Sequence, residues 1–567
     1  MKQQALKCLV LVGIGLVVGC EQKSADAKDK ATAPQAPASK SPDLLARCHF
    51  VGTRQLLAGP GVPTVKAIAE LPETAELRQQ TLKRLGAVLI GALSGDTGAA
   101  SSNRVAALLP LLGEWLAAES FLEARGVPNR PPEITLAVRL DETRVGAWKT
   151  ALADFMTAAQ LGPPAEIKAD GFTGWEVKLR GAPNLLRFVS AGSWALIGCG
   201  QDDLPGLAQA VARGKGGGRP FAEPAAGLLA AELNLPRMAE GWGLATFFEG
   251  PAREWPQVAL TVNADGNNLR TRMRLTYADP LSWKLEKWSL PTNTIRDPLV
   301  SFTALQPLAP WLAKSALIRD LGIQPLPNQL FLWALTDPPT QTFGAVPFAD
   351  VTNALAQLSR KLPALENKTL AERNLGQFLY VTNRSQVVWD GLMALLPALS
   401  PFVEPGGQFM IGTIFPPFPM TNLPPVELLS QFVGRTNLVY YDWEITQTRL
   451  DQLRVLASMT ETILRRQPTA KPANLNRFSP RRLAQKFLAA IVPHLSRKTD
   501  RGLEGESITE VSLTSPRELT LVRRSPAGLT ALEFIGLSWW LESPDFPRFG
   551  PASSSAGSPA ARPANPR

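Results

Sequence analysis

Histidine, cysteine and long apolar runs are scarce in this 567-residue chain. With only two histidines, His49 and His494, it has little material for a histidine-rich metal site or a histidine-based proton relay. The catalytic patterns HExxH, CxxC, GxSxG and GxGxxG do not occur. No nucleic-acid-binding motif occurs either. We therefore expect no metal, no cofactor and no nucleic-acid partner, and the sequence favours a protein that is not an enzyme.

A membrane-spanning helix needs about 20 consecutive apolar residues, and no segment offers them. The best candidate in the body of the chain, residues 387–403, is interrupted by Asp390, Pro397 and Pro401. The apolar run at the start, Cys8 to Val18, has only 11 residues. We therefore expect no segment that crosses a bilayer.

The first twenty residues nevertheless point to a membrane. Lys2 and Lys7 precede the short apolar run, which ends in Val17-Val18-Gly19-Cys20. This order resembles the lipobox of bacterial lipoproteins. The resemblance implies that residues 1–19 are a signal peptide, that cleavage precedes Cys20, and that acyl chains such as palmitate are attached there. Because Glu21 follows, rather than aspartate, the family's sorting rule implies the outer membrane, facing the periplasm, rather than the inner membrane.

Positive charge is concentrated in one zone. Removal of the two lysines in the signal peptide lowers the formal net charge from +10 to +8. Residues 465–524 contain 13 Lys or Arg and five Asp or Glu. This basic zone predicts an anionic partner such as lipid headgroups or an acidic polymer. The alternative is an ordinary solvated helix face with charged strand edges.

Two cysteines, Cys48 and Cys199, remain after loss of Cys8 and lipidation of Cys20. An exported compartment permits a disulfide between them, and two buried free thiols are the alternative. His49 follows Cys48, but neighbouring side chains on a strand point to opposite faces. A Cys–His nucleophile pair is therefore not expected.

Composition divides the chain into five parts. Residues 20–42 and 548–567 have almost no bulky apolar side chains, which predicts a disordered tether and a disordered tail. At about 5–6 Å per square root of residue number, the tether reaches roughly 25 Å from a membrane. Between these segments we expect two α+β domains, residues 43–285 and 286–547.

Both predicted domains mix helices with antiparallel hairpins, which indicates an α+β fold. The first is expected to begin with helices at 62–93 and 103–125, followed by strands such as 133–140, 185–190 and 194–199 and a hairpin at 257–277. The second is expected to contain a strand at 437–445 and a closing meander of 507–514, 518–523 and 528–541. The repeated Ala-Leu-Leu-Pro at residues 107–110 and 394–397 suggests a diverged duplication.

The strongest candidates for chemistry are carboxylates on one predicted strand. There Tyr440, Asp442 and Glu444 share one face, and two neighbouring carboxylates can serve acid–base catalysis. An ordinary half-buried strand has the same pattern. Asp96, in Asp96-Thr97-Gly98, resembles an aspartic-protease motif, but it occurs once and follows no apolar strand.

Two stretches of the second domain, residues 437–445 and 540–544, resemble a group of uncharacterised bacterial lipoproteins. That resemblance implies no activity. The sequence therefore favours a membrane-anchored envelope lipoprotein with a non-enzymatic binding or assembly role. The alternatives are a carboxylate-dependent hydrolase of envelope glycan or peptide, and a carrier of hydrophobic ligands.

Overall fold

Most of the chain between residues 44 and 547 is described in the computed structural model. The described residues are 44–59, 61–94, 102–126, 132–169, 172–179, 185–201, 204–215, 217–222, 227–242, 254–336, 340–392, 395–416, 422–465, 482–495, 497–499, 502–543 and 546–547. The predicted signal peptide, tether and tail lie outside them. None of the described helices is long and apolar enough to cross a membrane.

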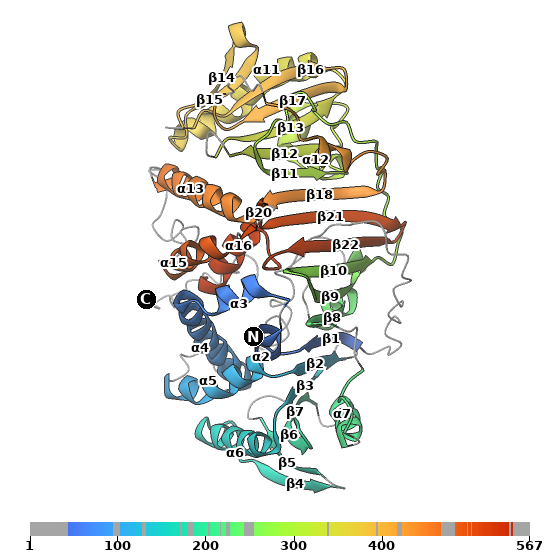
Figure 1. Ribbon diagram of the computed structural model, residues 1–567, viewed down its shortest axis with the longest axis vertical. Coiled ribbons are helices and arrows are strands. Elements are labelled where there is room, and N and C mark those ends of the chain that lie inside the picture. The colour runs from blue at the N-terminus through green and yellow to red at the C-terminus, as the bar shows by residue number, and fades with distance from the viewer. Residues whose placement is uncertain are drawn as a thin grey trace, which may run out of the picture.

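One antiparallel sheet of 20 strands runs along the molecule (Figure 1). The pairings place the strands in the spatial order β4-β5-β6-β7-β3-β2-β1-β8-β9-β10-β22-β21-β18-β11-β12-β13-β17-β16-β15-β14. The first ten strands in the chain are β1 (Leu44–Phe50), β2 (Ser120–Arg125), β3 (Glu133–Arg139), β4 (Ala165–Ala169), β5 (Phe172–Lys178), β6 (Leu185–Ala191), β7 (Trp194–Gly200), β8 (Leu229–Asn234), β9 (Gln257–Asp265) and β10 (Asn268–Thr276). The other ten are β11 (Leu299–Leu305), β12 (Leu330–Leu335), β13 (Thr342–Phe348), β14 (Gln377–Val381), β15 (Gln386–Asp390), β16 (Ala398–Glu404), β17 (Gly407–Thr413), β18 (Leu438–Ile445), β21 (Glu506–Ser515) and β22 (Glu518–Ser525).

The two sets of ten strands follow the same path. In each set, three strands form a meander, a helix follows, and four more strands return to pair with the third strand. The next strand pairs with the first, and a hairpin completes the set. This architecture confirms the α+β class with two helix-plus-sheet halves. The repeated Ala-Leu-Leu-Pro is no trace of the shared path, because Leu109 lies in a helix whereas Leu396 lies between β15 and β16.

The described helices occupy the connections between strands, except α16, which follows the last strand. In the first half they are α2 (Thr53–Ala58), α3 (Pro63–Ala69), α4 (Pro72–Ser94), α5 (Ser102–Ala117), α6 (Glu142–Ala158), α7 (Pro205–Lys215) and α8 (Leu235–Trp242). In the second half they are α9 (Ala309–Leu312), α10 (Ala316–Leu321), α11 (Val351–Glu372), α12 (Val426–Ser430), α13 (Thr446–Arg465), α15 (Arg482–Ile491) and α16 (Ala531–Glu542). A short hairpin of β19 (Arg497–Thr499) and β20 (Gly502–Glu504) follows α15.

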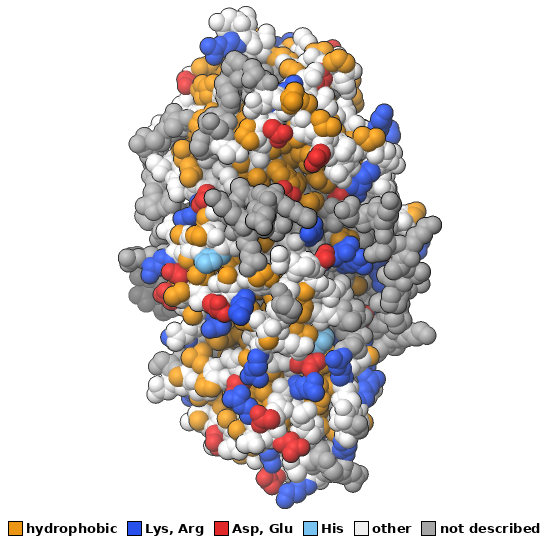
Figure 2. Space-filling view, in the orientation of Figure 1, with side chains coloured by type: hydrophobic (Ala, Val, Ile, Leu, Met, Phe, Trp, Pro, Cys, Tyr) orange, Lys and Arg blue, Asp and Glu red, His pale blue; other side chains and the backbone are white. Residues whose placement is uncertain are grey.

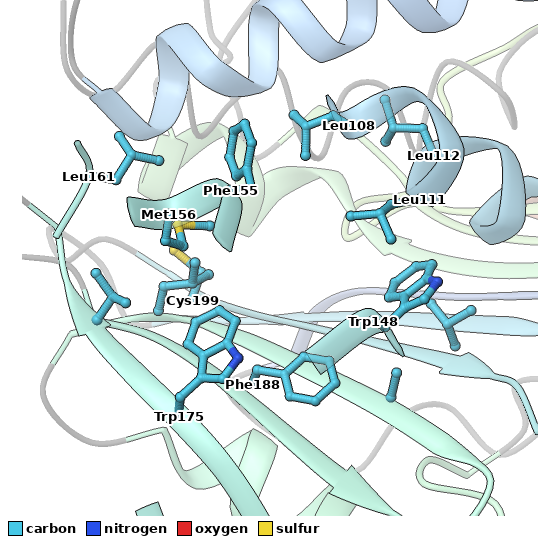
Figure 3. Close-up of a cluster of buried hydrophobic side chains, with 14 of the residues drawn as sticks. Leu108, Leu111, Leu112, Trp148, Phe155, Met156, Leu161, Trp175, Phe188 and Cys199 are labelled. Atoms are coloured by element: carbon cyan, nitrogen blue, oxygen red, sulfur yellow. The ribbon is translucent and has the colours of Figure 1, made fainter. Parts of the chain in front are cut away.

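Helices cover both faces of the sheet in the first half. On one face, α6 and α5 pack against β5, β6 and β7 around Trp148, Phe155, Trp175 and Phe188, as Figure 3 shows. On the other face, α7 packs against Phe121 of β2 and Leu196 of β7. Because both faces are buried, these strands contain apolar residues at successive positions.

A helical layer connects the two halves. Its members α4, α13, α15 and α16 lie along one side of the sheet (Figure 1). They bury one cluster that contains Leu77 of α4, Leu450 of α13, Phe487 of α15 and Phe534 of α16. Helices from both halves of the chain therefore share one core.

The pairing of β10 with β22 joins the halves within the sheet. It extends from Leu269 opposite Ser525 to Thr276 opposite Glu518. The cluster on one face of this joint draws side chains from both halves, including Leu260 and Met273 from the first and Leu521 from the second. The halves therefore do not form separate sheets.

Most of the strands predicted above are confirmed, and two predictions were wrong. The predicted helix over 103–125 ends at Ala117, and Ser120–Arg125 is strand β2 instead. Pairing with β1 and β3 on its two sides outweighs local helix propensity there. The predicted final strand is helix α16. Thr530 caps it by accepting a hydrogen bond from the Glu533 N–H, while the Glu533 carboxylate accepts one from the Thr530 N–H.

Replacement of Leu521 with alanine tests the joint. Leu521 is 1 % exposed, so truncation should lower the free energy of unfolding by about 2–5 kcal/mol. Because the side chain packs against both halves, we expect one urea transition that shifts as a whole, followed by circular dichroism. Leu423→Ala, at a residue that is 80 % exposed, is the control and should change stability by less than about 0.5 kcal/mol. Two transitions, of which only one shifts, would contradict the joint.

Candidate functional site

The predicted strand face of Tyr440, Asp442 and Glu444 exists, and it is buried rather than open. All three lie on β18, and the charges of Asp442 and Glu444 act on the hydroxyl of Tyr440. Asp442 is 9 % exposed and Glu444 5 %. The face is covered by the segment that leads into α16 and by α13.

The two carboxylates belong to a buried polar ladder that crosses five neighbouring strands. One row consists of residues directly opposite one another on β10, β22, β21, β18 and β11: Thr271, Arg523, Thr509, Asp442 and Thr303. The adjacent row contains Ser525, Ser507, Glu444 and Ser301. Every member of this polar ladder is buried except Thr303, which is half-buried.

Hydrogen bonds within the ladder engage both carboxylates. Thr303 Oγ1 donates to Asp442 Oδ1 at 2.6 Å. The backbone N–H of Ala531, the first residue of α16, donates to Glu444 Oε1 at 2.8 Å. Glu444 therefore holds the N-terminus of a helix, because its oxygen accepts one of the N–H groups that have no partner within the helix.

Hydroxyl groups continue the ladder from Glu444 towards β22. Thr446 Oγ1 and Ser507 Oγ lie 2.7 Å apart. Ser507 Oγ donates to Ser525 Oγ at 2.9 Å, and Ser525 Oγ donates to the carbonyl of Leu529 at 3.1 Å. This chain of hydroxyls ties the start of α13 to β21, β22 and the segment before α16.

Arg523 supplies positive charge inside the ladder. Its guanidinium is fully buried and donates to Glu533 Oε1 at 2.8 Å and to the carbonyl of Gly528. Arg523 belongs to the basic zone of residues 465–524, so this member of the zone is not available to an external anion. Residues 466–481 of the zone lie outside the described residues.

Burial controls the protonation of the ladder. Burial, with a further contribution from Asp442, raises the pKa of Glu444 to about 8. Burial lowers the pKa of Arg449, which lies near both carboxylates. Burial also raises the pKa of Tyr440 well above its ordinary value, and Asp442 adds to the rise. Near neutral pH the Glu444 carboxyl is therefore largely protonated.

The polar ladder has the contacts of a structural network and lacks the geometry described for a hydrolytic site. A pair of catalytic carboxylates must face a cleft that admits a substrate and a water molecule. Asp442 and Glu444 instead hold Thr303 and the start of α16. The carboxylate-dependent hydrolase is not favoured by this arrangement. The third carboxylate candidate, Asp96, lies outside the described residues.

The two cysteines of the body are free, so the disulfide alternative is wrong. Cys48 lies on β1 and Cys199 on β7, with β2 and β3 between them. That separation is about 14 Å at the usual strand spacing, well beyond disulfide reach. Burial raises the pKa of each thiol to about 12, which makes both unreactive.

His49 points away from Cys48, as the strand geometry predicts. It stacks on Phe121 with ring centroids 4.2 Å apart, and its Nε2 lies 3.1 Å from Glu119 Oε1. This hydrogen bond is the main reason why the pKa of Glu119 falls to about 2. Within the described part of the chain, no group of three or more His, Cys, Asp or Glu side chains could hold a metal ion.

Three grooves lie between the helices, and the residues that line them were not predicted from the sequence. A groove of about 590 Å³ lies between α4 and α5, and one of about 470 Å³ lies between α4 and α15. The third, which we call the helical groove, lies between α13, α15 and α16 and has a volume of about 760 Å³. Neither Asp442 nor Glu444 lines any of the three.

The helical groove has apolar walls and also contains polar residues. Its apolar walls are Val455, Met459, Leu488, Ile535 and Trp539. Asp451, Arg454 and Gln485 are among its polar residues. The indole N–H of Trp539 is buried and has no hydrogen-bond partner in the described structure. Four-residue spacings on α13 (455 and 459) and α16 (535 and 539) were the available sequence signal.

Comparisons with known proteins give no family for this chain. No family model and no curated protein matches it. Among solved structures, a chain of TP0453 in crystal form III is similar with a TM-score of 0.22 and 8 % identity, over 42 % of this chain and 78 % of that chain. A likeness at this level supports no argument about function.

Replacement of Glu444 with glutamine tests the protonation of the ladder. The folded-state pKa of about 8 lies above the ordinary value of 4.5, so the folded state retains a proton that the unfolded chain releases between these values. Stability should therefore be highest at low pH within this window and should fall as pH rises towards 8, by on the order of a few kcal/mol. Glu444→Gln should remove that slope.

The measurement is urea denaturation of both proteins from pH 5 to pH 9. Glu372→Gln, at an exposed residue of α11, is the control and should retain the wild-type slope. Parallel stability curves for wild type and Glu444→Gln would show that this carboxyl is not protonated by burial.

Proposed function

We propose that this chain is a lipid-anchored protein of the bacterial cell envelope with a non-enzymatic binding role. The lipobox-like Val17-Val18-Gly19-Cys20 supports the anchor, and Glu21 supports the outer membrane, facing the periplasm. The helical groove is the observation on which the binding role rests. Its proposed occupant is an amphipathic helix of a partner protein.

The walls of the groove suit such a helix. Val455 and Met459 lie one turn apart on α13, and Ile535 and Trp539 lie one turn apart on α16. Val455 is 47 % exposed, so its side chain is available to a partner. An amphipathic helix recognises a groove by placing residues at four-residue spacing between such walls. Asp451 and Arg454 provide polar margins that fix its orientation.

The position of the grooves suits the binding of a partner protein. The three grooves lie between helices on the outside of the molecule, where a partner protein can reach them.

Site-specific crosslinking tests the groove. A photoreactive phenylalanine at Val455 should crosslink one partner protein in the producing bacterium, identified by mass spectrometry. The matched control places the same group at Leu532 of α16, which is 67 % exposed and does not line the groove. The group at Leu532 should give no such crosslink. A second change, Met459→Glu, in the variant with the group at Val455 should reduce crosslinking at least about tenfold. Equal crosslinking from both sites, or none, would contradict the proposal.

Cys20→Ser tests the anchor. Acyl chains on Cys20 hold the protein at the membrane, since two or more chains anchor stably. The wild-type chain should therefore partition into detergent on phase separation, and Cys20→Ser should move it to the aqueous phase. Mass spectrometry of the N-terminal peptide should show acylated Cys20. A wild-type protein that keeps residues 1–19 and carries no acyl group would refute the anchor.

A further inference from the structure

Four arginines share one face of the sheet at the joint between the halves. Arg270, Arg272 and Arg274 alternate along β10, so their side chains point to the same face. Arg524 of β22 lies directly opposite Arg270. We call these four residues the arginine face. Met273 and Leu521 pack on the opposite face of the sheet.

The arrangement places like charges against each other. Like charges directly opposite on neighbouring strands destabilise a sheet, and Arg270 and Arg524 are such a pair. Burial, and secondarily the charge of Arg270, lowers the pKa of Arg272. Both Arg272 and Arg524 are nevertheless exposed to solvent. A bound anion would relieve this repulsion.

Acidic neighbours compensate the arginine face only in part. Arg274 Nε lies 3.9 Å from Glu518 Oε2. Asp265 acts on Arg272 at longer range. Within the described residues, neither Arg270 nor Arg272 forms an ion pair.

Other arginines on this side of the sheet have close acidic partners. Arg47 Nε lies 3.0 Å from Glu123 Oε2 on the neighbouring strand. Arg435 forms a two-pronged ion pair with Glu510. Arg270 and Arg272 therefore differ from Arg47 and Arg435, because no described acidic side chain pairs with them. On the side of the molecule seen in Figure 2, Lys and Arg side chains are interspersed with acidic ones over much of the surface.

We propose that the arginine face docks on the anionic headgroups of a lipid bilayer. The four guanidinium groups lie on two neighbouring strands of the sheet, so they can contact several headgroups at once. Arginine pairs with phosphate through two hydrogen bonds. The described chain begins at Leu44 of β1, which is separated from β10 only by β8 and β9. That distance is about 14 Å across the strands. The predicted tether of roughly 25 Å would keep a bilayer within reach.

The inference uses the proposed anchor as the source of a nearby bilayer, but its test does not require the anchor. The unlipidated chain from residue 20 onwards, carrying Cys20→Ser, is mixed with vesicles of phosphatidylcholine alone or with added phosphatidylglycerol. Sedimentation with the vesicles measures binding. We expect binding only to the anionic vesicles, and we expect added salt to weaken it.

Arg270→Glu/Arg272→Glu should reduce binding to anionic vesicles at least about tenfold. Arg270→Gln/Arg272→Gln, which introduces no acidic groups, should give a smaller loss in the same direction. The matched control is Arg360→Glu/Arg384→Glu, at exposed residues of α11 and the β14–β15 turn. It makes the same change in net charge and should bind as the wild type does.

Three outcomes would overturn the proposal. The first is unchanged binding of both Arg270/Arg272 variants with wild-type circular dichroism. The second is equal loss in the Arg360/Arg384 control, which would indicate a response to net charge alone. The third is full displacement from vesicles by inorganic phosphate at matched ionic strength, which would indicate a site for a free anion. None of these outcomes bears on acylation of Cys20, so failure of the anchor would be seen separately.

Discussion

The pairing of β10 with β22 is the constraint on which the rest of this structure depends. It joins two halves that follow the same strand path into one sheet of 20 strands. Because side chains alternate between faces, the register of this one pair decides what each face contains. Met273 and Leu521 meet in an apolar cluster, Thr271 and Arg523 continue into the polar ladder, and Arg270 and Arg524 meet on the reverse face. A shift of one residue would exchange the faces and destroy all three arrangements.

The polar ladder and the helical layer add contacts between the strands at the joint and the helices that pack on them. Glu444 holds the start of α16, and Arg523 pairs with Glu533 on the same helix. The helix is thereby fixed over the strands that meet at the joint. It then forms a wall of the helical groove with α13 and α15. Removal of Glu533 would leave the charge of Arg523 buried and uncompensated, which is strongly destabilising. The groove thus takes its shape from the polar ladder beneath it.

Local sequence patterns predicted the position of the strands better than they predicted what packs against each strand. Alternation placed Tyr440, Asp442 and Glu444 on one face of β18, which the structure bears out. The same pattern could not show that this face is buried, because its cover comes from Ala531, 87 residues further along the chain. Strand β2 was mistaken for helix, since its burial depends on β1 and β3. Separation of Cys48 and Cys199 by two strands likewise follows from topology and not from the number of residues between them.

Hydrogen exchange of the backbone amides tests the joint most directly. In native conditions, amides of a core strand exchange only when the whole protein unfolds, whereas amides at a loose contact exchange through local opening. The account predicts that the amides of β10 and β22 that pair across the joint are as strongly protected as those between β3 and β7 or between β13 and β17. Rapid exchange confined to β10 and β22, with both halves still protected, would show two bodies in contact and would contradict a single continuous sheet.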